Sequence, residues 1–561
     1  MSNSITTSFI KPVNRRRKCS QIQKTAINSK SSIPTELELS NNQSNHLTDE
    51  YKTFVCSQSY LGKKGYTIPK CALSKEDDET LRQELFVKPF VKCNYGMPDS
   101  TTESFPVYRE SNQKIYIPRF YGIHRYGLPM KSEISIGETI SVDFIKPLRD
   151  YQNSIIDIYM KHILTTPNEI GNGAILEVPC GFGKTVMALK IIALLCKKTL
   201  ILVHKEFLMN QWIERIAEFL PEAKVGCIQG QTVDIQNKDI VIGMIQSLYN
   251  KNFELTFFDQ FGFTIIDEVH RIGSEQFSKT LLKTITPYML GISATVERKD
   301  KLTKVLNMFI GDKIYSKKRD DDDMVSVRAI EYNVNDFEFN EIEYDFRGNP
   351  KYSTMISKLC EFGPRSDFIV KVIGDLVLEN DENQIMVLAH NRNLLTYLHD
   401  SILHKKIASV GYYVGGMKQS ELLKTETQQI VLATYAMAAE ALDIKTLSTL
   451  VMVTPKTDII QSVGRILRVK HENPIVVDIV DKHDIFQNQW KQRMRFYKQC
   501  NYRIRYINSN KYTNMKLDWE TDILWRRVFD PKNTNRNVSS INNDEDSEKK
   551  IQKCLIDINM I

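Results

Sequence analysis

The 561-residue chain contains no run of about 18 uninterrupted apolar residues, the length that a membrane-spanning helix needs. Its best candidate, residues 186–196, is shorter and contains Lys190. The basic cluster Arg15 to Lys18 has no apolar segment behind it, so it does not form a secretory signal. These absences predict a soluble protein that is not secreted and has no membrane partner.

The sequence also has no C-x-x-C pair. Its 10 cysteines are scattered from Cys19 to Cys554, which argues against a zinc ribbon, a redox motif or a disulfide framework. Scattered free thiols suit a reducing environment. We therefore expect no structural metal, and we expect an intracellular, reducing compartment.

A strong charge of either sign is absent as well. Lys and Arg number 75 and Asp and Glu number 68, which leaves a net charge of +7. An excess this small is compatible with a polyanionic partner but does not demonstrate one. The 42% hydrophobic and 25% charged residues are typical of a globular protein, and the length favours three or four domains of roughly 150 residues each.

Both ends of the chain differ from the middle. Residues 1–45 are rich in Ser, Asn, Thr and Lys, and residues 530–561 are rich in Asn and charged side chains. This composition predicts a disordered N-terminal tail and a flexible C-terminal tail. In residues 51–147, short segments are punctuated by Gly and Pro, and a strand over Lys114–Ile117 stops at a proline. We expect a small β-containing N-terminal accessory domain there.

Two longer regions alternate short apolar runs with helical periodicities. In residues 148–310, strands are predicted over 174–178, 199–203, 239–243, 263–267 and 288–292, with helices over 185–196 and 206–219. In residues 366–515, strands are predicted over 384–388, 409–414, 429–433, 449–453 and 474–478, with a helix over 391–404. Such alternation indicates parallel sheets covered on both faces. The expected fold class is α/β, with two such domains in tandem joined by a polar connector over residues 311–365.

A turn with two glycines lies between the first of these strands and its helix. The glycines let backbone N–H groups surround phosphate oxygens, and the helix N-terminus adds the positive end of its dipole. Lys184 is expected to reach the β- and γ-phosphates of ATP, and Thr185 to ligate Mg²⁺. The full pattern G-x-x-x-x-G-K-[ST] asks for glycine at position 178, where this chain has valine, so an ordinary glycine-rich turn is the alternative. The predicted nucleotide-binding residues of the turn are Val178, Pro179, Cys180, Gly181, Phe182, Gly183, Lys184 and Thr185.

The strand predicted over 263–267 ends in two carboxylates. Beside a phosphate loop, Asp267 can hold Mg²⁺, and Glu268 can orient or deprotonate the attacking water. Alone, such a pair would be an ordinary solvated strand end, and its place downstream of the loop favours catalysis. His270 is by itself more typical of a packing residue than of a catalyst.

Two arginines of the second region, Arg465 and Arg468, lie three residues apart, which on a helix places both on one face. If the second domain presents them to a nucleotide, they can stabilise the charge that develops on the transferred phosphoryl group. An exposed basic helix is the alternative.

In their order along the chain, these segments resemble the motifs of the superfamily 2 helicases and translocases. The resemblance covers residues 148–481 and implies two RecA-like domains with ATP and Mg²⁺ between them. Gln152 resembles the residue that contacts adenine, and Gln461 opens a match to the nucleotide-site motif Q-x-x-G-R-x-x-R that ends at Arg468. Residues 430–443 resemble the fifth motif, with Ala441 where glycine is usual.

Two further segments resemble the parts of such enzymes that connect chemistry to motion. The segment from Asp267 through Val269 to His270 resembles the DExH box. Ser293, Ala294 and Thr295 resemble the motif that couples hydrolysis to domain movement.

Within the superfamily, the sequence resembles the XPB-type group and the helicases of large DNA viruses, including the poxvirus transcript-release helicase. Three features carry this resemblance: the Pro-Cys-Gly-x-Gly-Lys loop, the box ending in Val-His, and residues 293–300. Within the last of these, Glu297 to Asp300 match the Arg-Glu-Asp element of XPB proteins only in part. The N-terminal segment and residues 481–498 resemble the viral helicases.

The resemblance implies an ATP-dependent helicase or translocase that acts on DNA or RNA through backbone contacts, in viral-type transcription, replication or repair, with proteins of those processes as partners. For a viral chain, the compartment would be the host cytoplasm, the virion or the nucleus.

Other interpretations stay open at this point. The alternative function is a transcription-complex factor that uses ATP as a conformational switch without strand separation. A restriction-enzyme motor subunit would need a nuclease motif, which the flanks do not contain. The basic, aromatic run from Trp490 to Tyr512 is the candidate nucleic-acid patch outside the motor, and a helix packed on the second domain is its equal alternative.

Overall fold

The computed structural model describes residues 47–89, 104–166, 170–179, 181–254, 256–269, 275–297, 302–317, 325–346, 348–440, 444–467, 471, 473–514 and 523–531. The predicted tails lie outside these residues, apart from residues 530 and 531. Among the described helices, none has the length and apolar character needed to cross a bilayer.

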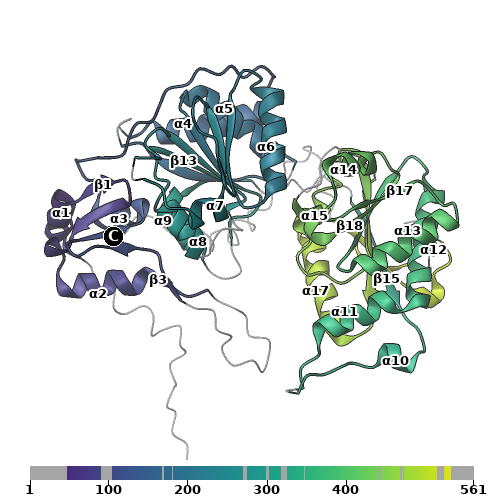
Figure 1. The fold of residues 1–561 in the computed structure, drawn as a ribbon. Helices are drawn as coiled ribbons and strands as arrows, with labels where there is room; N and C mark the ends of the chain where they lie inside the picture. The colour runs from purple at the N-terminus through teal and green to yellow at the C-terminus, as the bar shows by residue number, and fades with distance from the viewer. Residues whose placement is uncertain are drawn as a thin grey trace, which may run out of the picture. The chain divides into compact units, whose positions relative to one another are not determined.

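The N-terminal region is built on a four-stranded antiparallel sheet with strand order β1-β2-β6-β5 (Figure 1). One face of this sheet packs apolar side chains into a small core that includes Leu61, Tyr66, Ile68 and Ile115. Strands β3 and β4 form a separate antiparallel pair. The elements are α1 (Asp49–Gln58), β1 (Tyr60–Gly62), β2 (Gly65–Pro69), the 3-10 helix η1 (Lys70–Ala72), α2 (Lys75–Glu84), β3 (Phe86–Val87), β4 (Phe105–Pro106), β5 (Arg109–Glu110), β6 (Lys114–Ile117) and α3 (Arg119–Tyr126).

A buried arginine joins this region to the next one. Arg119, at the start of α3, is 2% exposed, and its guanidinium donates hydrogen bonds of 2.5 to 3.1 Å to the backbone carbonyls of Ile170, Gly171, Thr286 and Pro287. Burial lowers the pKa of Arg119 to about 10, so the side chain stays charged at neutral pH. Charge-assisted hydrogen bonds therefore tie α3 to the segments that precede strands β7 and β13.

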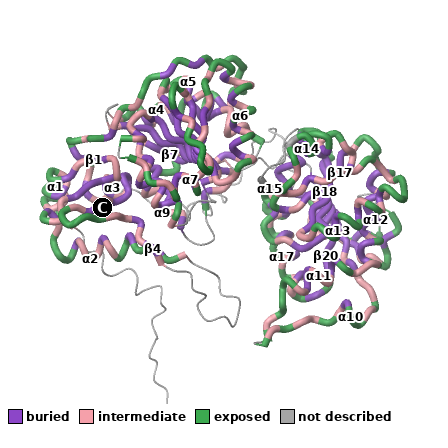
Figure 2. Tube along the Cα trace, in the orientation of Figure 1, coloured by how far each residue is buried: buried purple, intermediate pink, exposed green. Residues whose placement is uncertain are grey.

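The first large sheet has eight strands in the order β10-β9-β11-β8-β12-β13-β7-β14, and all neighbours are parallel except β10 and β9. Its central strands are buried along their length, as Figure 2 shows, because helices pack on both faces of the apolar runs. The elements are α4 (Asp150–Ile163), β7 (Gly173–Glu177), α5 (Lys184–Leu195), β8 (Thr199–Val203), α6 (Glu206–Phe219), β9 (Val225–Gln229), β10 (Thr232–Val233), β11 (Ile240–Met244), α7 (Ile245–Asn250), β12 (Phe263–Asp267), α8 (Glu275–Leu281), β13 (Tyr288–Ser293), α9 (Thr303–Ile310) and β14 (Lys313–Ser316).

The second large sheet also has eight strands, in the order β17-β18-β16-β19-β20-β15-β21-β22, with only β22 antiparallel to its neighbour. Separate apolar clusters cover its two faces. The elements are β15 (Ser326–Tyr332), α10 (Phe337–Asn340), α11 (Tyr352–Glu361), α12 (Gly363–Glu379), β16 (Gln384–Ala389), α13 (Arg392–His404), β17 (Val410–Tyr413), α14 (Gln419–Glu426), β18 (Ile430–Thr434), α15 (Tyr435–Glu440), β19 (Leu447–Met452), α16 (Ile460–Val463), β20 (Ile475–Asp481), α17 (Asp484–Gln499), β21 (Arg503–Asn508), the 3-10 helix η3 (Ser509–Lys511) and β22 (Arg526–Phe529).

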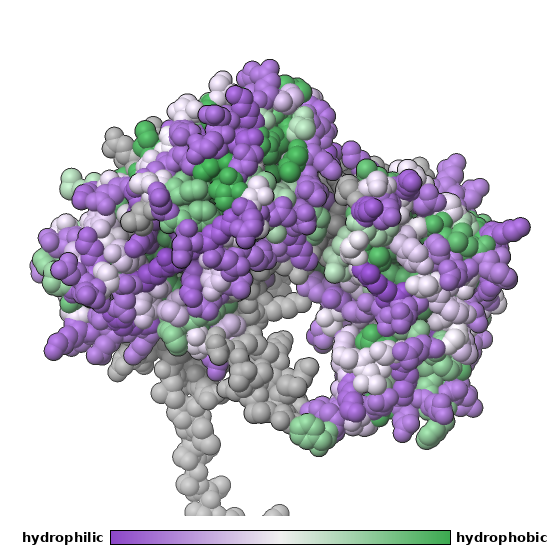
Figure 3. All heavy atoms as spheres, in the orientation of Figure 1, coloured by the Kyte–Doolittle hydropathy of each residue, from purple (hydrophilic) through white to green (hydrophobic). Residues whose placement is uncertain are grey.

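The predicted fold class is confirmed: two RecA-like α/β domains follow a small β-containing region. Strand β15 comes from the stretch predicted as a connector, and it lies between β20 and β21 in the second sheet. Six of its seven residues are buried, because the segment joins two parallel neighbours in the interior. Figure 3 shows hydrophilic residues over most of the visible face, with apolar residues in small separate groups.

The basic, aromatic run from Trp490 to Tyr512 forms α17, β21 and η3, and much of it is internal. Arg493 is 1% and Arg505 3% exposed, and Trp490, Tyr497 and Tyr502 are buried. The side chains of Lys491, Arg495 and Lys498 lie on the exposed side of α17. Some residues of the run thus lie in the core and others on a solvated helix face. This arrangement is the one expected for a helix packed on the second domain, the alternative to a nucleic-acid patch.

Candidate active site

The turn from β7 into α5 has the backbone shape of a phosphate loop. Gly181 and Gly183 have φ values of 86° and 79°, in the left-handed region that glycine adopts without strain. Gly183 directly precedes α5, whose first residues are Lys184 and Thr185. A Cβ at Gly183 would stand 2.3 Å from Nε2 of Gln152, so the loop admits no side chain there. Cys180 lies outside the described residues.

Gln152 holds this loop from the side. The residue is 5% exposed in α4, its Oε1 accepts a 2.9 Å hydrogen bond from the backbone N–H of Arg149, and its Nε2 donates to the carbonyl of Phe182 at 3.0 Å. The Tyr151 ring packs against the Phe182 ring with centroids 5.3 Å apart. The start of α4 therefore fixes the loop, and the adenine contact expected for Gln152 stays a prediction.

Lys184 meets the acidic pair that ends β12. Its Nζ lies 2.9 Å from Oε1 of Glu268, and both side chains are largely buried, at 12% and 20% exposure. Glu268 has a φ of 50°, an unusual value for a residue with a side chain, and such strain is typical of functional positions. The parallel strands of the sheet thus bring together two predicted residues that are 84 positions apart.

Asp267 is the last residue of β12 and is 6% exposed. Its Oδ2 accepts a 2.9 Å hydrogen bond from the indole N–H of Trp212 in α6, and its Oδ1 accepts one of 2.9 Å from the backbone N–H of Glu268. Burial raises the pKa of Asp267 to about 6, the neighbouring Glu268 carboxylate adds to the rise, and the Lys184 ammonium and the Trp212 N–H oppose it. A cation that binds Asp267 would relieve this unfavourable negative charge.

The donor set suits Mg²⁺. This ion prefers oxygen ligands, and in nucleotide sites it is held by one or two protein oxygens together with substrate phosphates. Asp267 offers a carboxylate whose pKa is raised by burial and by the neighbouring Glu268 carboxylate, and Thr185 offers a hydroxyl in the first turn of α5. The residues present therefore fit the ion that the phosphate loop implies.

The end of β13 is tied to the phosphate loop. The backbone N–H of Val178 donates to the carbonyl of Ser293 at 2.9 Å, and the Ser293 hydroxyl donates to the carbonyl of Thr295 at 2.6 Å. Ala294 lies between them in a bend. A rearrangement of this segment would therefore pull directly on the residue that precedes the loop.

Two residues of this site were not predicted from the sequence. Trp212 holds Asp267, and Glu177, at the end of β7, accepts from the N–H of Val296 at 2.7 Å, from Lys313 at 2.9 Å and from the Ser316 hydroxyl at 2.6 Å. Burial acts to raise the pKa of Glu177, but these three donors outweigh it and lower the pKa. The signal for Glu177 was a lone charged residue inside an apolar strand directly before the loop. No comparable signal marks Trp212.

The second domain places its predicted residues around a short helix. Gln461 is partly exposed in α16, which ends at Val463, and Arg465 lies in the following turn at 7% exposure. Arg465 lies outside a helix because α16 ends at Val463, directly before Gly464, a residue of low helix propensity. Arg468 lies outside the described residues.

Other predicted positions also lie outside the described part of the chain. They include His270, Ala441 and Asp300. Val269, the residue before His270, is described and fully buried, and a Cβ at Gly291 on β13 would stand 3.1 Å from its Cγ1.

Comparisons with known proteins agree with this arrangement. The family model described as "Type III restriction enzyme, res subunit" matches residues 145–298, and the model "Helicase conserved C-terminal domain" matches residues 368–470. A protein of Acanthamoeba polyphaga mimivirus named as an ATP-dependent RNA helicase is 35% identical over 83% of this chain and 90% of its own length. A protein named as a helicase in Invertebrate iridescent virus 6 is 25% identical over 76% of this chain and 96% of its own length.

An archaeal relative has a shorter match. The DNA 3'-5' translocase XPB2 of Sulfurisphaera tokodaii is 30% identical over 36% of this chain and 43% of its own length. Together, these matches favour the predicted helicase or translocase over a transcription factor that uses ATP only as a switch. The chain belongs to the superfamily 2 helicases of large DNA viruses, ATP-dependent enzymes that hydrolyse nucleoside triphosphate and act on nucleic acid.

Proposed function

We propose that the phosphate loop and the Asp267–Glu268 pair form the Mg²⁺-dependent ATPase site, and that hydrolysis there drives movement along a nucleic-acid strand. The observation that carries the proposal is the 2.9 Å ion pair between Lys184 and Glu268 beside the buried Asp267. A triphosphate in the loop offers the Lys184 ammonium new partners, which frees Glu268 to act on water.

The chemistry follows from these positions. Glu268 orients the attacking water and accepts its proton, the water oxygen bonds to the γ-phosphorus, and the bond to the β–γ bridging oxygen breaks to leave ADP and phosphate. Thr185 and Asp267 would hold Mg²⁺, which supplies charge neutralisation on the β- and γ-phosphate oxygens. Arg465 and Arg468 would stabilise the transferred phosphoryl group from the second domain.

The polymer is the finer part of the proposal. The mimivirus relative is named as an RNA helicase and the archaeal relative as a DNA translocase, so we infer a grip on the phosphate backbone that both polymers share. Such a grip is sensitive to salt and largely independent of sequence. Protein partners from transcription or replication, and the intracellular, reducing location, stay predictions.

The first test is the steady-state ATPase rate without polymer and with single-stranded DNA, duplex DNA or single-stranded RNA, each at low and high salt. We expect stimulation by at least one polymer that weakens as salt rises. Stimulation by DNA alone would assign a DNA translocase, and stimulation mainly by RNA would assign an RNA helicase. An ATPase indifferent to all three polymers would contradict the proposal.

The second test removes the lysine of the loop. Lys184→Ala should reduce ATPase activity to background, because the β- and γ-phosphates lose their ammonium partner. Lys190→Ala removes the same charge from the same helix α5 away from the loop, and it should leave the rate near that of the unaltered protein. Near-normal activity of Lys184→Ala would overturn the assignment of the site.

A further inference from the structure

The N-terminal sheet carries two tyrosines on the face opposite its core. Tyr60 on β1 is paired with Thr67 on β2, which is paired with Tyr116 on β6, which is paired with Arg109 on β5. Because side chains alternate along a strand, these four residues form one row across the sheet. Both tyrosines are partly exposed, whereas Thr67 between them is 1% exposed.

The ring of Tyr60 lies over a glycine. A Cβ at Gly62 would stand 3.1 and 3.6 Å from two ring carbons of Tyr60 and 3.0 Å from the hydroxyl of Thr67. A larger side chain at this position would displace the ring. Gly62 thus lets the tyrosine lie along the strand instead of standing away from it.

Lysine ammonium groups sit beside both rings. Lys64 Nζ is 5.0 Å from the ring centroid of Tyr116, and Lys114 and Lys131 are 5.1 and 5.0 Å from that of Tyr60. Lys114 also donates a 3.1 Å hydrogen bond to the Tyr60 hydroxyl. We name these five residues, Tyr60, Lys64, Lys114, Tyr116 and Lys131, the tyrosine face.

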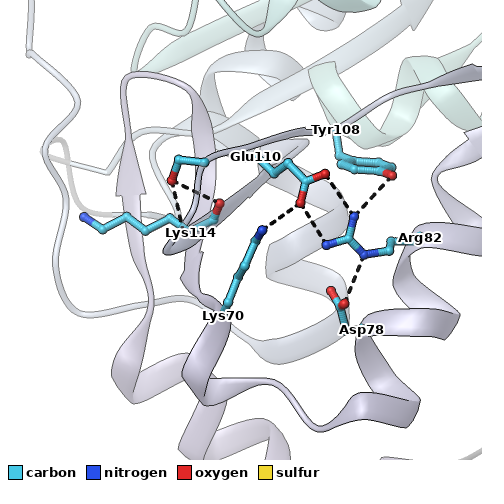
Figure 4. A network of polar contacts seen from close by, with 7 residues as sticks. Lys70, Asp78, Arg82, Tyr108, Glu110 and Lys114 are labelled. Atoms are coloured by element: carbon cyan, nitrogen blue, oxygen red, sulfur yellow. Dashed lines mark hydrogen bonds and ion pairs between the residues drawn. The ribbon is translucent and has the colours of Figure 1, made fainter.

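Of the two acidic groups nearby, Glu110 is engaged away from the tyrosine face and Glu133 is engaged within it. Glu110 forms ion pairs with Lys70 at 2.8 Å and with Arg82 at 3.0 Å, and Figure 4 shows the Lys114 side chain extending away from that network. Glu133 is paired at 2.7 Å with Lys131, so it neutralises one of the three lysines of the tyrosine face. Within the described ranges, neither Lys64 nor Lys114 forms an ion pair, so the tyrosine face keeps a positive excess.

This combination is the one that single-stranded nucleic acid uses. Bases stack on aromatic rings, and the backbone phosphates bind lysine ammonium groups. The two tyrosines are two strand spacings apart, about 10 Å, and a four-stranded sheet with accessible aromatics can stack two or three bases. A duplex keeps its bases stacked on each other, so it could use the lysines but not the rings.

We propose that the tyrosine face is a second nucleic-acid site, outside the two motor domains, that binds a single strand by stacking bases on Tyr60 and Tyr116 while Lys64 and Lys114 contact its phosphates. The inference rests on the proposed action on nucleic acid and adds a place where the strand is held before or after the motor. Binding moves each ammonium from its ring to a phosphate and exposes the ring face to a base.

The lysines can be tested without disturbing the core. In the full chain, Lys64→Gln with Lys114→Gln should weaken binding of a labelled single-stranded oligonucleotide roughly 10-fold in fluorescence anisotropy at low salt. The slope of log affinity against log salt should fall by about 1.4, at roughly 0.7 per lost phosphate contact. Lys75→Gln with Lys161→Gln, two exposed lysines away from this face, is the matched control and should bind like the unaltered protein.

The ring is tested by a pair of substitutions. Tyr116→Leu keeps an apolar side chain but removes stacking, and it should lower single-strand affinity roughly 10-fold with little change for a duplex. Tyr116→Phe keeps the ring and should bind as before. Cross-linking of a bromouracil-substituted strand to Tyr60 or Tyr116, mapped by mass spectrometry, should depend on the two lysines.

Basal ATPase without polymer should be unchanged in all these variants, because no residue that contacts the phosphate loop or the Asp267–Glu268 pair is altered. If polymer stimulates the unaltered protein but the lysine and tyrosine variants bind like their controls, the proposed function stands and the tyrosine face is overturned as a site. If polymer neither binds nor stimulates the unaltered protein, both proposals fall. Equal losses on single strands and duplex in Tyr116→Leu would overturn the stacking.

Discussion

The two RecA-like domains treat their buried carboxylates in different ways. On β20 of the second domain, Arg493 binds both oxygens of Asp478 at 2.7 and 2.8 Å, and Arg365 binds both oxygens of Asp481 at the same distances. On β12 of the first domain, the hydrogen bonds to Asp267 from described residues come from two neutral N–H donors, and the Glu268 carboxylate lies beside it.

We infer that the arginine-paired carboxylates of the second domain serve stability, whereas Asp267 of the first domain serves function. A bidentate arginine balances the charge of a buried carboxylate and donates a hydrogen bond to each of its oxygens. Asp267 has no such arginine among the described residues, and burial together with the neighbouring Glu268 carboxylate raises its pKa to about 6. Asp481, the last residue of β20, thus has a bidentate arginine, whereas Asp267, the last residue of β12, has none among the described residues.

The largest effect on stability is expected when the arginine partner of a buried carboxylate in the second domain is removed. Arg493→Ala leaves Asp478 buried without its counter-charge, and it should lower the free energy of unfolding by about 3–5 kcal/mol, measured by urea or thermal unfolding. Arg495→Ala, on the exposed side of the same helix, should change it by about 0.5 kcal/mol or less. Equal losses in the two variants would show that the Arg493–Asp478 pair is not a stabilising contact.

A smaller change in stability is expected in the first domain. Asp267→Asn removes an unbalanced charge, but its amide oxygen can accept only one of the two N–H donors, so in Mg²⁺-free buffer at pH 7 the free energy of unfolding should change by about 1 kcal/mol or less. ATPase activity should nevertheless fall by roughly 100-fold or more, because the predicted metal ligand is lost. A loss of about 3–5 kcal/mol in this variant, as expected for Arg493→Ala, would indicate that Asp267 is held like Asp478.

The pH dependence of stability sharpens this prediction. The pKa of Asp267 is raised from 3.8 to about 6 in the folded protein, so the folded state holds the proton more tightly than the unfolded state. The resulting stabilisation is complete below pH 3.8 and is lost as pH rises through 6. Without Mg²⁺, the unaltered protein should therefore gain stability relative to Asp267→Asn as pH falls across this window. A constant difference between the two curves would contradict the raised pKa.

The sequence predicted what is local to one segment. The apolar runs at 199–203 and 263–267 coincide with β8 and β12, and the two-glycine turn leads into α5. The acid at the end of β12 could be assigned because parallel strands end at a shared edge of the sheet.

What the sequence could not show are contacts set by packing across long separations. Trp212 donates a hydrogen bond to Asp267 although the two residues are 55 positions apart in the sequence, and no sequence pattern links them. Arg493 belongs to a basic run, and composition cannot distinguish an arginine paired in the core from one on a solvated helix face. Strand β15 lies inside the stretch predicted as a connector and directly follows β14 in the element order, so the alternation of strands and helices did not assign it to the second sheet.

The smallest expected effect concerns the indole that holds Asp267. Trp212→Phe keeps an aromatic ring in the 1%-exposed site and removes the 2.9 Å hydrogen bond to Oδ2, so the carboxylate loses the donor that orients it. We expect a loss of about 2 kcal/mol in stability and a roughly 10-fold higher Mg²⁺ requirement in ATPase titrations.

Trp490→Phe, in the second domain, replaces an equally large buried indole that packs against Tyr497 and Tyr506, and it should cost stability without changing the Mg²⁺ requirement. The same Mg²⁺ dependence in both variants would mean that the indole fills space and does not position the metal ligand. Different dependences would show that the open carboxylate of the first domain is oriented by a neutral donor, where the second domain uses a charged one.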